Sequence, residues 1–323
     1  MMNPIGPTTG ALVLLTVALW GGTPVAIRYS VDVLPPVAVS GLRFALAALF
    51  MLAWCRFSGG GLRLRRGQFV PSLVLGVLLF AQIALFAAGI QFSTASHGSL
   101  FINTFVFWVV VIEHFATRSD RLTVVRFVGL LLAAGGVVLL LSTREPTQIP
   151  NAASSPRDEP TLTGDLMLLG SGLLLAIKLI YTKRATLIVE PGKLIFWHDV
   201  FGVVLFAVYS AIFETVDVSA LIDFDRPGTV PALLGIAYQG IVIAGFCFAV
   251  QARLLQRHSA VQLSVFSFLT PVFGIALGVL FRGDSLSPWL FASAMLVTVG
   301  IILVNRKASR RGRNTPGAAK PTP

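Results

Sequence analysis

The sequence predicts an all-α integral membrane protein with ten transmembrane helices. Of its 323 residues, 55% are hydrophobic and only 12% are charged, and the mean hydropathy is +0.82. Soluble domains carry about a quarter charged residues, so this composition excludes a soluble fold. Long apolar stretches also recur along the chain, which indicates that lipid is the solvent for most of it.

Stretches of about twenty apolar residues predict the individual spans. The first begins near Ala11 with no Lys or Arg before it, and further spans follow, so we expect a membrane helix there rather than a signal peptide. Arg43 interrupts span two and Lys178 interrupts span six. His198 and Asp199 interrupt span seven. The ten predicted spans are residues 11–30, 37–55, 70–90, 97–116, 123–142, 164–182, 195–213, 229–250, 261–281 and 287–304.

The distribution of basic residues predicts the orientation in the membrane. If the N-terminus lies inside, 18 of the 25 Lys and Arg fall in cytoplasmic loops or the C-terminal tail, 5 fall outside, and Arg43 and Lys178 lie within spans. Cytoplasmic loops carry an excess of Lys and Arg, so we expect both termini in the cytoplasm. A net charge of +11 can also indicate nucleic-acid binding. Loop positions explain the charge without it, so the expected partner is the lipid bilayer and not a nucleic acid.

A polar segment divides the chain into two halves of five spans each. Residues 143–163 contain four prolines and predict an irregular extracytoplasmic linker. The first repeat is expected over 11–142 and the second over 164–305. The basic residues of 306–323 predict a cytoplasmic tail beside anionic lipid headgroups.

The two halves look like copies of one unit. In the first, the polar turn S-D-R-L-T at 119–123 leads into a span with G-G-V-V-L-L at 135–140. In the second, G-D-S-L-S at 283–287 leads into V-G-I-I-L at 299–303. Because each unit has an odd number of spans, the second copy must be inserted upside down. Inverted repeats of this kind are typical of secondary transporters.

Four short motifs, in this order, carry a family resemblance. They are W-G-G-T-P-V-A-I-R at 20–28, L-R-F-A at 42–45, F-L-T-P-V-F at 268–273 and G-D-S-L at 283–286. The chain resembles the drug/metabolite transporter superfamily, specifically the EamA-type permeases with two five-helix repeats, over roughly residues 11–305. The resemblance implies alternating-access transport of small metabolites, often amino-acid export in bacteria. It also implies a multi-pass protein of the cell membrane, which in bacteria is the inner membrane.

Two departures from the family pattern are visible. The proline expected in span four is replaced around Val106, and both G-E-R-L turns carry Asp in place of Glu. We therefore expect span four to be less kinked than its counterpart in the second repeat.

Signatures of nucleotide hydrolysis, zinc chemistry and serine hydrolysis are missing from the sequence. It contains no G-x-x-x-x-G-K-[ST], no H-E-x-x-H and no G-x-S-x-G, and no clustered Cys or His ligands. We therefore predict no catalytic residues, no metal and no cofactor, and energy from a gradient of substrate or of a coupled ion.

Lys178 is the strongest candidate for a binding residue. A charge at this depth costs at least about 2.5–3.5 kcal/mol on insertion scales, so its side chain should face a wet cavity or a partner. Aligning the two repeats places it near Thr23, where the cavity of the resembled family lies. We expect its ammonium to receive a substrate carboxylate, with Tyr181 one turn away on the same face. Alternatively, Lys178 extends toward Lys183 and Arg184 at the cytoplasmic rim, or pairs with an acid.

Further polar and aromatic side chains lie midway along their spans and suit the orientation of a small ligand. The alternative for them is packing or an interhelical hydrogen bond. For Arg43 we expect a structural role at the helix end. The set is Trp20, Gln82, Asn103, Thr104, Trp108, Tyr238 and Gln239.

Four titratable residues lie at similar depth near the cytoplasmic side. Glu113 and His114 end span four, and His198 and Asp199 begin span seven. Buried carboxylates and histidines can titrate near neutral pH, so these residues are candidates for proton coupling. Alternatively, water, Lys178 or the basic loops satisfy them at the interface.

Together these observations predict a secondary transporter that exports small, amino-acid-like metabolites through a central cavity, as a monomer or homodimer. One alternative is a proton-coupled drug antiporter, although Lys178 would repel cations. A second is a membrane-embedded enzyme that uses Glu113, His114, His198 and Asp199.

Overall fold

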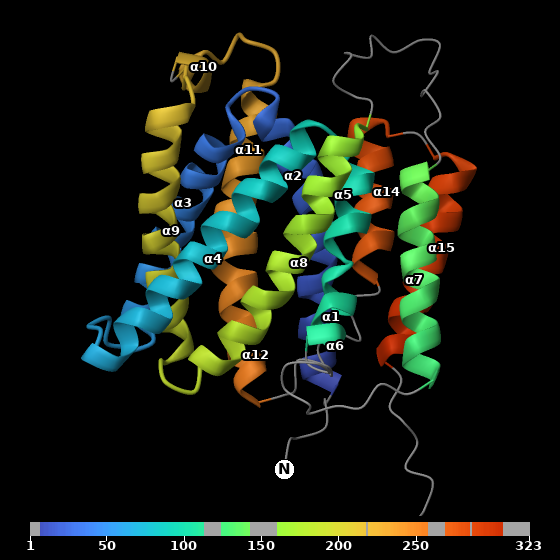
Figure 1. The fold of residues 1–323 in the computed structure, drawn as a ribbon. Helices are drawn as coiled ribbons and strands as arrows, with labels where there is room; N and C mark the ends of the chain where they lie inside the picture. Colours follow the sequence, from blue (N-terminus) through green and yellow to red (C-terminus); the bar gives the residue numbers. More distant parts are fainter. Residues whose placement is uncertain are drawn as a thin grey trace, which may run out of the picture.

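A computed structural model describes residues 7–112, 124–142, 160–217, 219–257, 269–284 and 286–305, which form helices joined by turns (Figure 1). The first half contains α1 (Pro7–Gly21), α2 (Thr23–Val31), α3 (Pro36–Phe57), α4 (Arg66–Gln91), α5 (Ala95–Ile102), α6 (Phe105–Ile112) and α7 (Val124–Ser142). The second contains α8 (Leu162–Ala185), α9 (Pro191–Phe213), α10 (Ser219–Ile222), α11 (Thr229–Ala237), η3 (Tyr238–Cys247), α12 (Phe248–Arg257), α14 (Thr270–Arg282) and α15 (Pro288–Asn305).

The helices agree with the predicted membrane class. Among the described residues, seven helical stretches are long and apolar enough to cross a membrane, and three shorter apolar helices cover Phe127–Leu139, Val272–Arg282 and Pro288–Gly300. Each predicted span overlaps one of these ten stretches. The all-helical class is therefore confirmed for the described residues, whereas the crossing of the bilayer by all ten stretches and the cytoplasmic position of both termini stay predictions.

Span four is broken although it lacks the family's proline. Asn103 and Thr104 separate α5 from α6. The Asn103 Nδ2 donates to the Ser99 carbonyl at 2.6 Å, and the Thr104 Oγ1 donates to the Phe101 carbonyl at 2.7 Å. These side chains compete for carbonyl groups of the preceding helix. Span four is therefore interrupted without a proline. Its counterpart, span nine, is described only from residue 269, so the comparison of the two kinks stays a prediction.

A ten-residue π-helix, η3, lies between α11 and α12 and contains Tyr238 and Gln239. Segments of this type are rare and often occur at functional sites, because the wider turn changes the direction of the side chains that follow. Span eight therefore changes its helical register close to the centre of the molecule.

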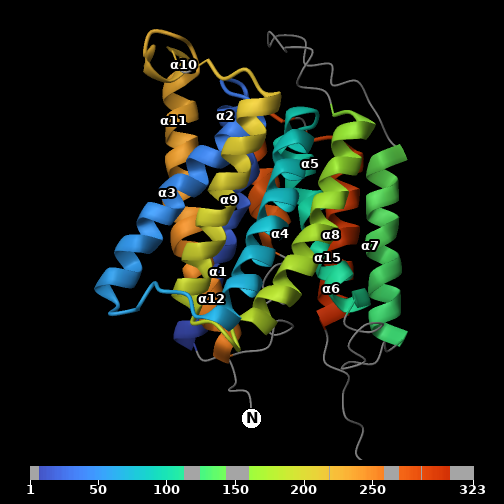
Figure 2. The same ribbon diagram turned by 60° about the vertical axis from the view of Figure 1, so that its left-hand side comes forward.

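The helix contacts follow the pattern expected of two inverted repeats. Span three packs on span six (α4 on α8). The equivalent contact after exchange of the halves is that of span eight with span one, and α11 does pack on α2. Spans two and seven (α3 and α9), four and nine (α5 and α14), and five and ten (α7 and α15) pack on each other. In each of these three pairs, the two spans hold the same position in their respective halves, so each pair lies on the symmetry axis that relates the halves. In Figures 1 and 2, α7 and α15 lie side by side at one edge of the bundle.

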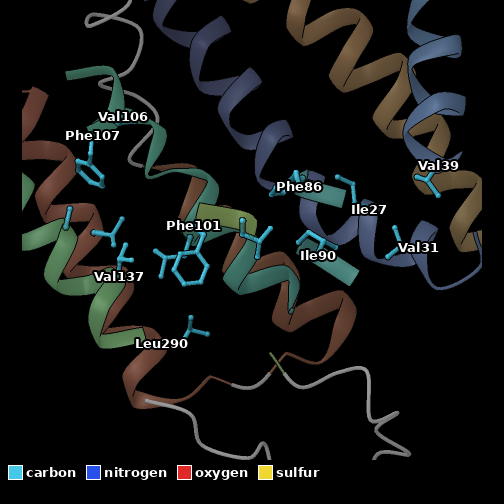
Figure 3. Packing of buried hydrophobic residues seen from close by; sticks show 14 of the residues in the cluster. Ile27, Val31, Val39, Phe86, Ile90, Phe101, Val106, Phe107, Val137 and Leu290 are labelled. Carbon is cyan, nitrogen blue, oxygen red and sulfur yellow. The ribbon is translucent and has the colours of Figure 1, made fainter. Parts of the chain in front are cut away.

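The largest buried apolar cluster contains residues of both halves. It runs from Val137 and Leu290, where α7 meets α15, past Phe101 to Ile27 and Ile90 (Figure 3). Since neither half encloses this cluster alone, packing between the halves positions the helices that surround the central cavity.

Candidate functional site

A cavity of about 140 Å³ lies between the two halves of the molecule. Residues of α1 to α6 line it from the first half, and residues of α8, α9, η3, α12 and α14 line it from the second. An apolar cavity of about 150 Å³ can hold benzene, so this space suits a small molecule. Most of the lining is apolar. The polar side chains in the lining are Thr23, Arg43, Gln82, Ser99, Asn103, Lys178, Thr182, His198, Gln251 and Thr270.

Lys178 lies in the cavity wall and is bound to the opposite half of the protein. Its side chain is only 6% exposed, and its Nζ donates to Gln82 Oε1 at 2.8 Å. Gln82 is held in turn, because its Nε2 donates to Ser171 Oγ at 3.0 Å and that hydroxyl donates to the Gln82 carbonyl at 2.9 Å. The ammonium also lies 5.2 Å from the centre of the Phe248 ring. Within the described part of the chain, Lys178 forms no ion pair with a carboxylate.

Arg43 is a second buried cation in the same wall. It is 2% exposed, its Nη1 donates to Gln239 Oε1 at 2.9 Å, and its guanidinium lies 4.7 Å from the Phe44 ring centre. Gln239 Nε2 donates onward to Ser30 Oγ at 3.0 Å. The Arg43 Nε has no hydrogen-bond partner among the described residues. We expected a structural role at the helix end. The position of Arg43 differs from the helix end that we expect from the sequence, because packing of α3 against α9 and η3 turns the residue inward, whereas its structural role stays a prediction.

His198 and Asp199 form a buried pair beside the cavity. The His198 Nδ1 lies 2.9 Å from Asp199 Oδ1, and the two residues are 2% and 0% exposed. His198 lines the cavity and meets the rings of Phe44 and Phe248 edge to face, whereas Asp199 is not in the lining. The Asp199 Oδ2 has no hydrogen-bond partner among the described residues.

The lining is therefore positively charged. It contains Lys178 and Arg43, and none of its described residues is Asp or Glu. Asp199 acts electrostatically on both cations from outside the lining, but no carboxylate pairs directly with either of them within the described part of the chain. Buried cations without a directly paired acid are costly in a membrane protein, and they are typically retained where they serve a ligand or an ion pathway.

The structure brings several predicted binding residues together and leaves others out. Lys178, Trp20, Thr23, Gln82 and Asn103 line the cavity, as does His198. Glu113 and His114, the other candidates for proton coupling, lie outside the described residues.

Five predicted binding residues do not line the cavity. Tyr181 packs against the apolar cluster around Leu75 and Leu194, toward the predicted cytoplasmic end of α8. Trp108 belongs to a second apolar cluster between α6, α8 and α12. The structure thus gives these two aromatic side chains a packing role.

The other three have local hydrogen bonds. Thr104 bonds the Phe101 carbonyl at the break in span four, and Tyr238 donates its hydroxyl proton to the Leu19 carbonyl at 2.5 Å. Gln239 accepts a hydrogen bond from the Arg43 guanidinium. These side chains shape the elements around the cavity without being part of its surface.

Two of the polar residues in the lining that we did not predict could have been recognised from the sequence. Arg43 interrupts an apolar span just as Lys178 does, so the same cost of a buried charge applies to it. Thr182 lies one turn after Lys178 on the same helix. Ser99 and Thr270 carry no such signal, because small polar residues occur throughout membrane helices. Gln251 lies one residue beyond the predicted span 229–250, where a polar residue is unremarkable.

Comparison with known families identifies the fold and its function class. The EamA-like transporter family matches this chain twice, over residues 8–142 and 162–306. The chain belongs to the EamA-like transporter family. It is a multi-pass protein of the cell membrane, as the family and the apolar helices indicate.

Two relatives of this EamA-family protein are described as a transporter and as an efflux pump. The chain is 24% identical to YoaV of Bacillus subtilis (strain 168), described as an uncharacterized transporter, with 91% of this chain and 95% of YoaV covered. It is 26% identical to a Salmonella typhimurium protein described as a probable amino-acid metabolite efflux pump, covering 91% of this chain and 93% of that protein. A solved crystal structure superimposes with a TM-score of 0.65 at 17% sequence identity, covering 92% of this chain and 96% of that one. This last likeness shows the shared fold.

Proposed function

We propose that this EamA-family transporter exports small, carboxylate-bearing metabolites of the amino-acid type by alternating access through the central cavity. The observation that carries the proposal is Lys178, a buried ammonium in the cavity wall with no carboxylate partner among the described residues. A substrate carboxylate would supply the missing countercharge.

The geometry of Lys178 favours this role over the alternatives considered from the sequence. An ammonium has three donors, and the hydrogen bond to Gln82 uses one of them. Its burial and its bond to α4 argue against extension toward the cytoplasmic rim. A hydrogen bond between an ammonium and a carboxylate is roughly twice as strong as one between neutral groups, so a bound carboxylate would be held firmly.

The apolar lining would accommodate the rest of the substrate. Phe86, Leu179 and Ile243 are among the apolar residues around the cavity, and a few convergent polar groups in an apolar pocket are typical of small-molecule sites. The relatives described as probable amino-acid metabolite efflux pumps support the same substrate class and an outward direction. A cationic drug is a poorer candidate, because Lys178 and Arg43 would repel it.

The pair His198 and Asp199 is our candidate for proton coupling. It lies next to Lys178 and Arg43, the two charged groups that act electrostatically on Asp199. A proton gained or lost by this pair would change the charge beside the substrate site, which is the requirement for linking proton movement to transport.

The experiment is transport by purified protein in proteoliposomes. Labelled leucine, related neutral amino acids and their deaminated acids are tested with and without a pH gradient, for the wild type and for Lys178→Met. Lys178→Arg keeps the charge, and Lys183→Met makes the same chemical change on the same helix outside the cavity lining.

We expect carboxylate-dependent flux that Lys178→Met lowers at least tenfold and that Lys183→Met leaves unchanged. Lys178→Arg should retain part of it. Folding of each variant is checked by its elution as a single species in detergent. The proposal would be refuted if the wild type carried none of these carboxylates, or if Lys178→Met carried them as fast as the wild type.

A further inference from the structure

We infer that the cavity selects small organic acids that lack an ammonium group, and that Arg43 is the second residue, with Lys178, that binds their oxygen atoms. The inference rests on the proposed function and narrows its substrate class from carboxylate-bearing metabolites in general to those with a net negative charge.

Arg43 has the properties of a ligand-binding side chain. It is almost completely buried, it lines the cavity, and its Nε lacks an acceptor among the described residues. The groups that it does contact, the Gln239 amide and the Phe44 ring, are both uncharged. An N–H of a buried guanidinium is costly without an acceptor, so a bound oxygen would satisfy it.

The Thr23 hydroxyl supplies a second unsatisfied group in the same lining. Its Oγ1 is buried without a hydrogen-bond partner among the described residues, and Thr23 lines the cavity as Arg43 does. Three residues of the lining therefore carry hydrogen-bonding groups that no described residue uses: the remaining donors of Lys178, the Nε of Arg43 and the hydroxyl of Thr23.

The same lining offers no carboxylate to an ammonium group. None of its described residues is acidic. Asp199 lies behind His198, fully buried, with its Oδ1 directed to the imidazole. Phe248, an aromatic face that could attract a cation, already has the Lys178 ammonium over it.

A zwitterionic amino acid would thus satisfy Lys178 with its carboxylate and place its ammonium in a cavity that holds two cations. An acid of the same skeleton with oxygen in place of the ammonium avoids this repulsion, and its extra oxygen can accept a hydrogen bond from Arg43 or Thr23. A 2-oxo acid with a short apolar chain fits both the charge and the volume of about 140 Å³.

The test compares leucine with 4-methyl-2-oxopentanoate, which share one carbon skeleton and differ only at C2, where leucine carries a hydrogen and an ammonium and the oxo acid carries a carbonyl oxygen. Each is measured for counterflow in proteoliposomes of the full-length protein, with empty liposomes as the background. We expect the wild type to carry the oxo acid with a kcat/KM at least tenfold above that for leucine. This comparison needs no variant, so it holds whether or not substitutions at Arg43 fold.

The role of Arg43 is tested by the ratio of kcat/KM for the oxo acid to kcat/KM for leucine. Arg43→Gln should lower kcat/KM for the oxo acid at least tenfold and raise kcat/KM for leucine, whose ammonium is then repelled by one cation fewer, whereas Arg43→Lys should restore part of the preference. A purely structural arginine would lower both substrates equally, and that result would overturn the assignment.

The outcomes separate this inference from the proposed function. Leucine carried as well as, or better than, the oxo acid would refute the inference while the proposed function stands. If neither compound nor any other carboxylate of the panel is carried, the proposed function fails, and the inference fails with it.

Discussion

The Nζ of Lys178 donates a 2.8 Å hydrogen bond to the Oε1 of Gln82, which joins α8 of the second repeat to α4 of the first. The bond holds a charged side chain in place without neutralising it, because the amide of Gln82 is uncharged. Ser171 holds that amide from its other side. The ammonium is thus oriented before any substrate arrives, and its charge remains available.

Gln82→Glu should convert this neutral support into an internal competitor of the substrate. The substitution keeps the shape of the side chain and places a carboxylate against Lys178. We expect the KM for carboxylate substrates to rise at least tenfold, equivalent to about 1.4 kcal/mol of binding free energy. Ser171→Ala is the control, since it removes a hydrogen bond to Gln82 without adding a charge. An unchanged KM in Gln82→Glu would contradict a substrate site at Lys178.

Asp199→Asn should uncouple transport from the pH gradient. An amide cannot take up or release a proton, so the pair with His198 would lose its acid. We expect accumulation driven by a pH gradient to disappear, while counterflow of substrate at equal pH on both sides stays within about twofold of the wild type. Gradient-driven accumulation that persists in Asp199→Asn would exclude this residue as a coupling site.

Two adjacent glycines of α7 should respond oppositely to the same substitution. A Cβ at Gly136 would lie 2.9 Å from the Ser293 carbonyl oxygen of α15, whereas a Cβ at Gly135 would meet nothing within 4 Å. Gly136→Ala should therefore force α7 and α15 apart and lower stability by about 1–3 kcal/mol.

Gly135→Ala is the matched control. It should leave stability unchanged or raise it by up to about 1 kcal/mol, because alanine favours a helix over glycine. Thermal unfolding of both variants in detergent is the measurement. Equal melting temperatures would contradict the close contact between α7 and α15.

Labelling of single cysteines should report the orientation of the helices. In a background of Cys55→Ala and Cys247→Ala, Ser58→Cys lies in a turn predicted to be cytoplasmic and Asp225→Cys in one predicted to be external. Both of these positions are exposed. An impermeant maleimide added to intact spheroplasts should label Asp225→Cys alone, and both variants after permeabilisation. The reverse pattern would invert the predicted topology.

The pattern of apolar stretches predicted the helices well, because lipid imposes a length and a composition on each span that no other environment requires. It also singled out Lys178, since one charge is conspicuous among twenty apolar neighbours. The break between α5 and α6 was not predicted. It depends on whether the side chains of Asn103 and Thr104 turn back onto their own helix, and local sequence leaves that choice open.

The sequence by itself determined the membrane class, the approximate helices and the two-repeat organisation. Only the tertiary structure decided which side chains face the cavity, including Arg43 inside and Tyr181 outside. The physical reason is that membrane helices are apolar all round, because lipid is as apolar as the protein interior. Hydrophobic periodicity therefore does not distinguish their inner from their outer faces. The direction of each face depends on contacts between the two halves.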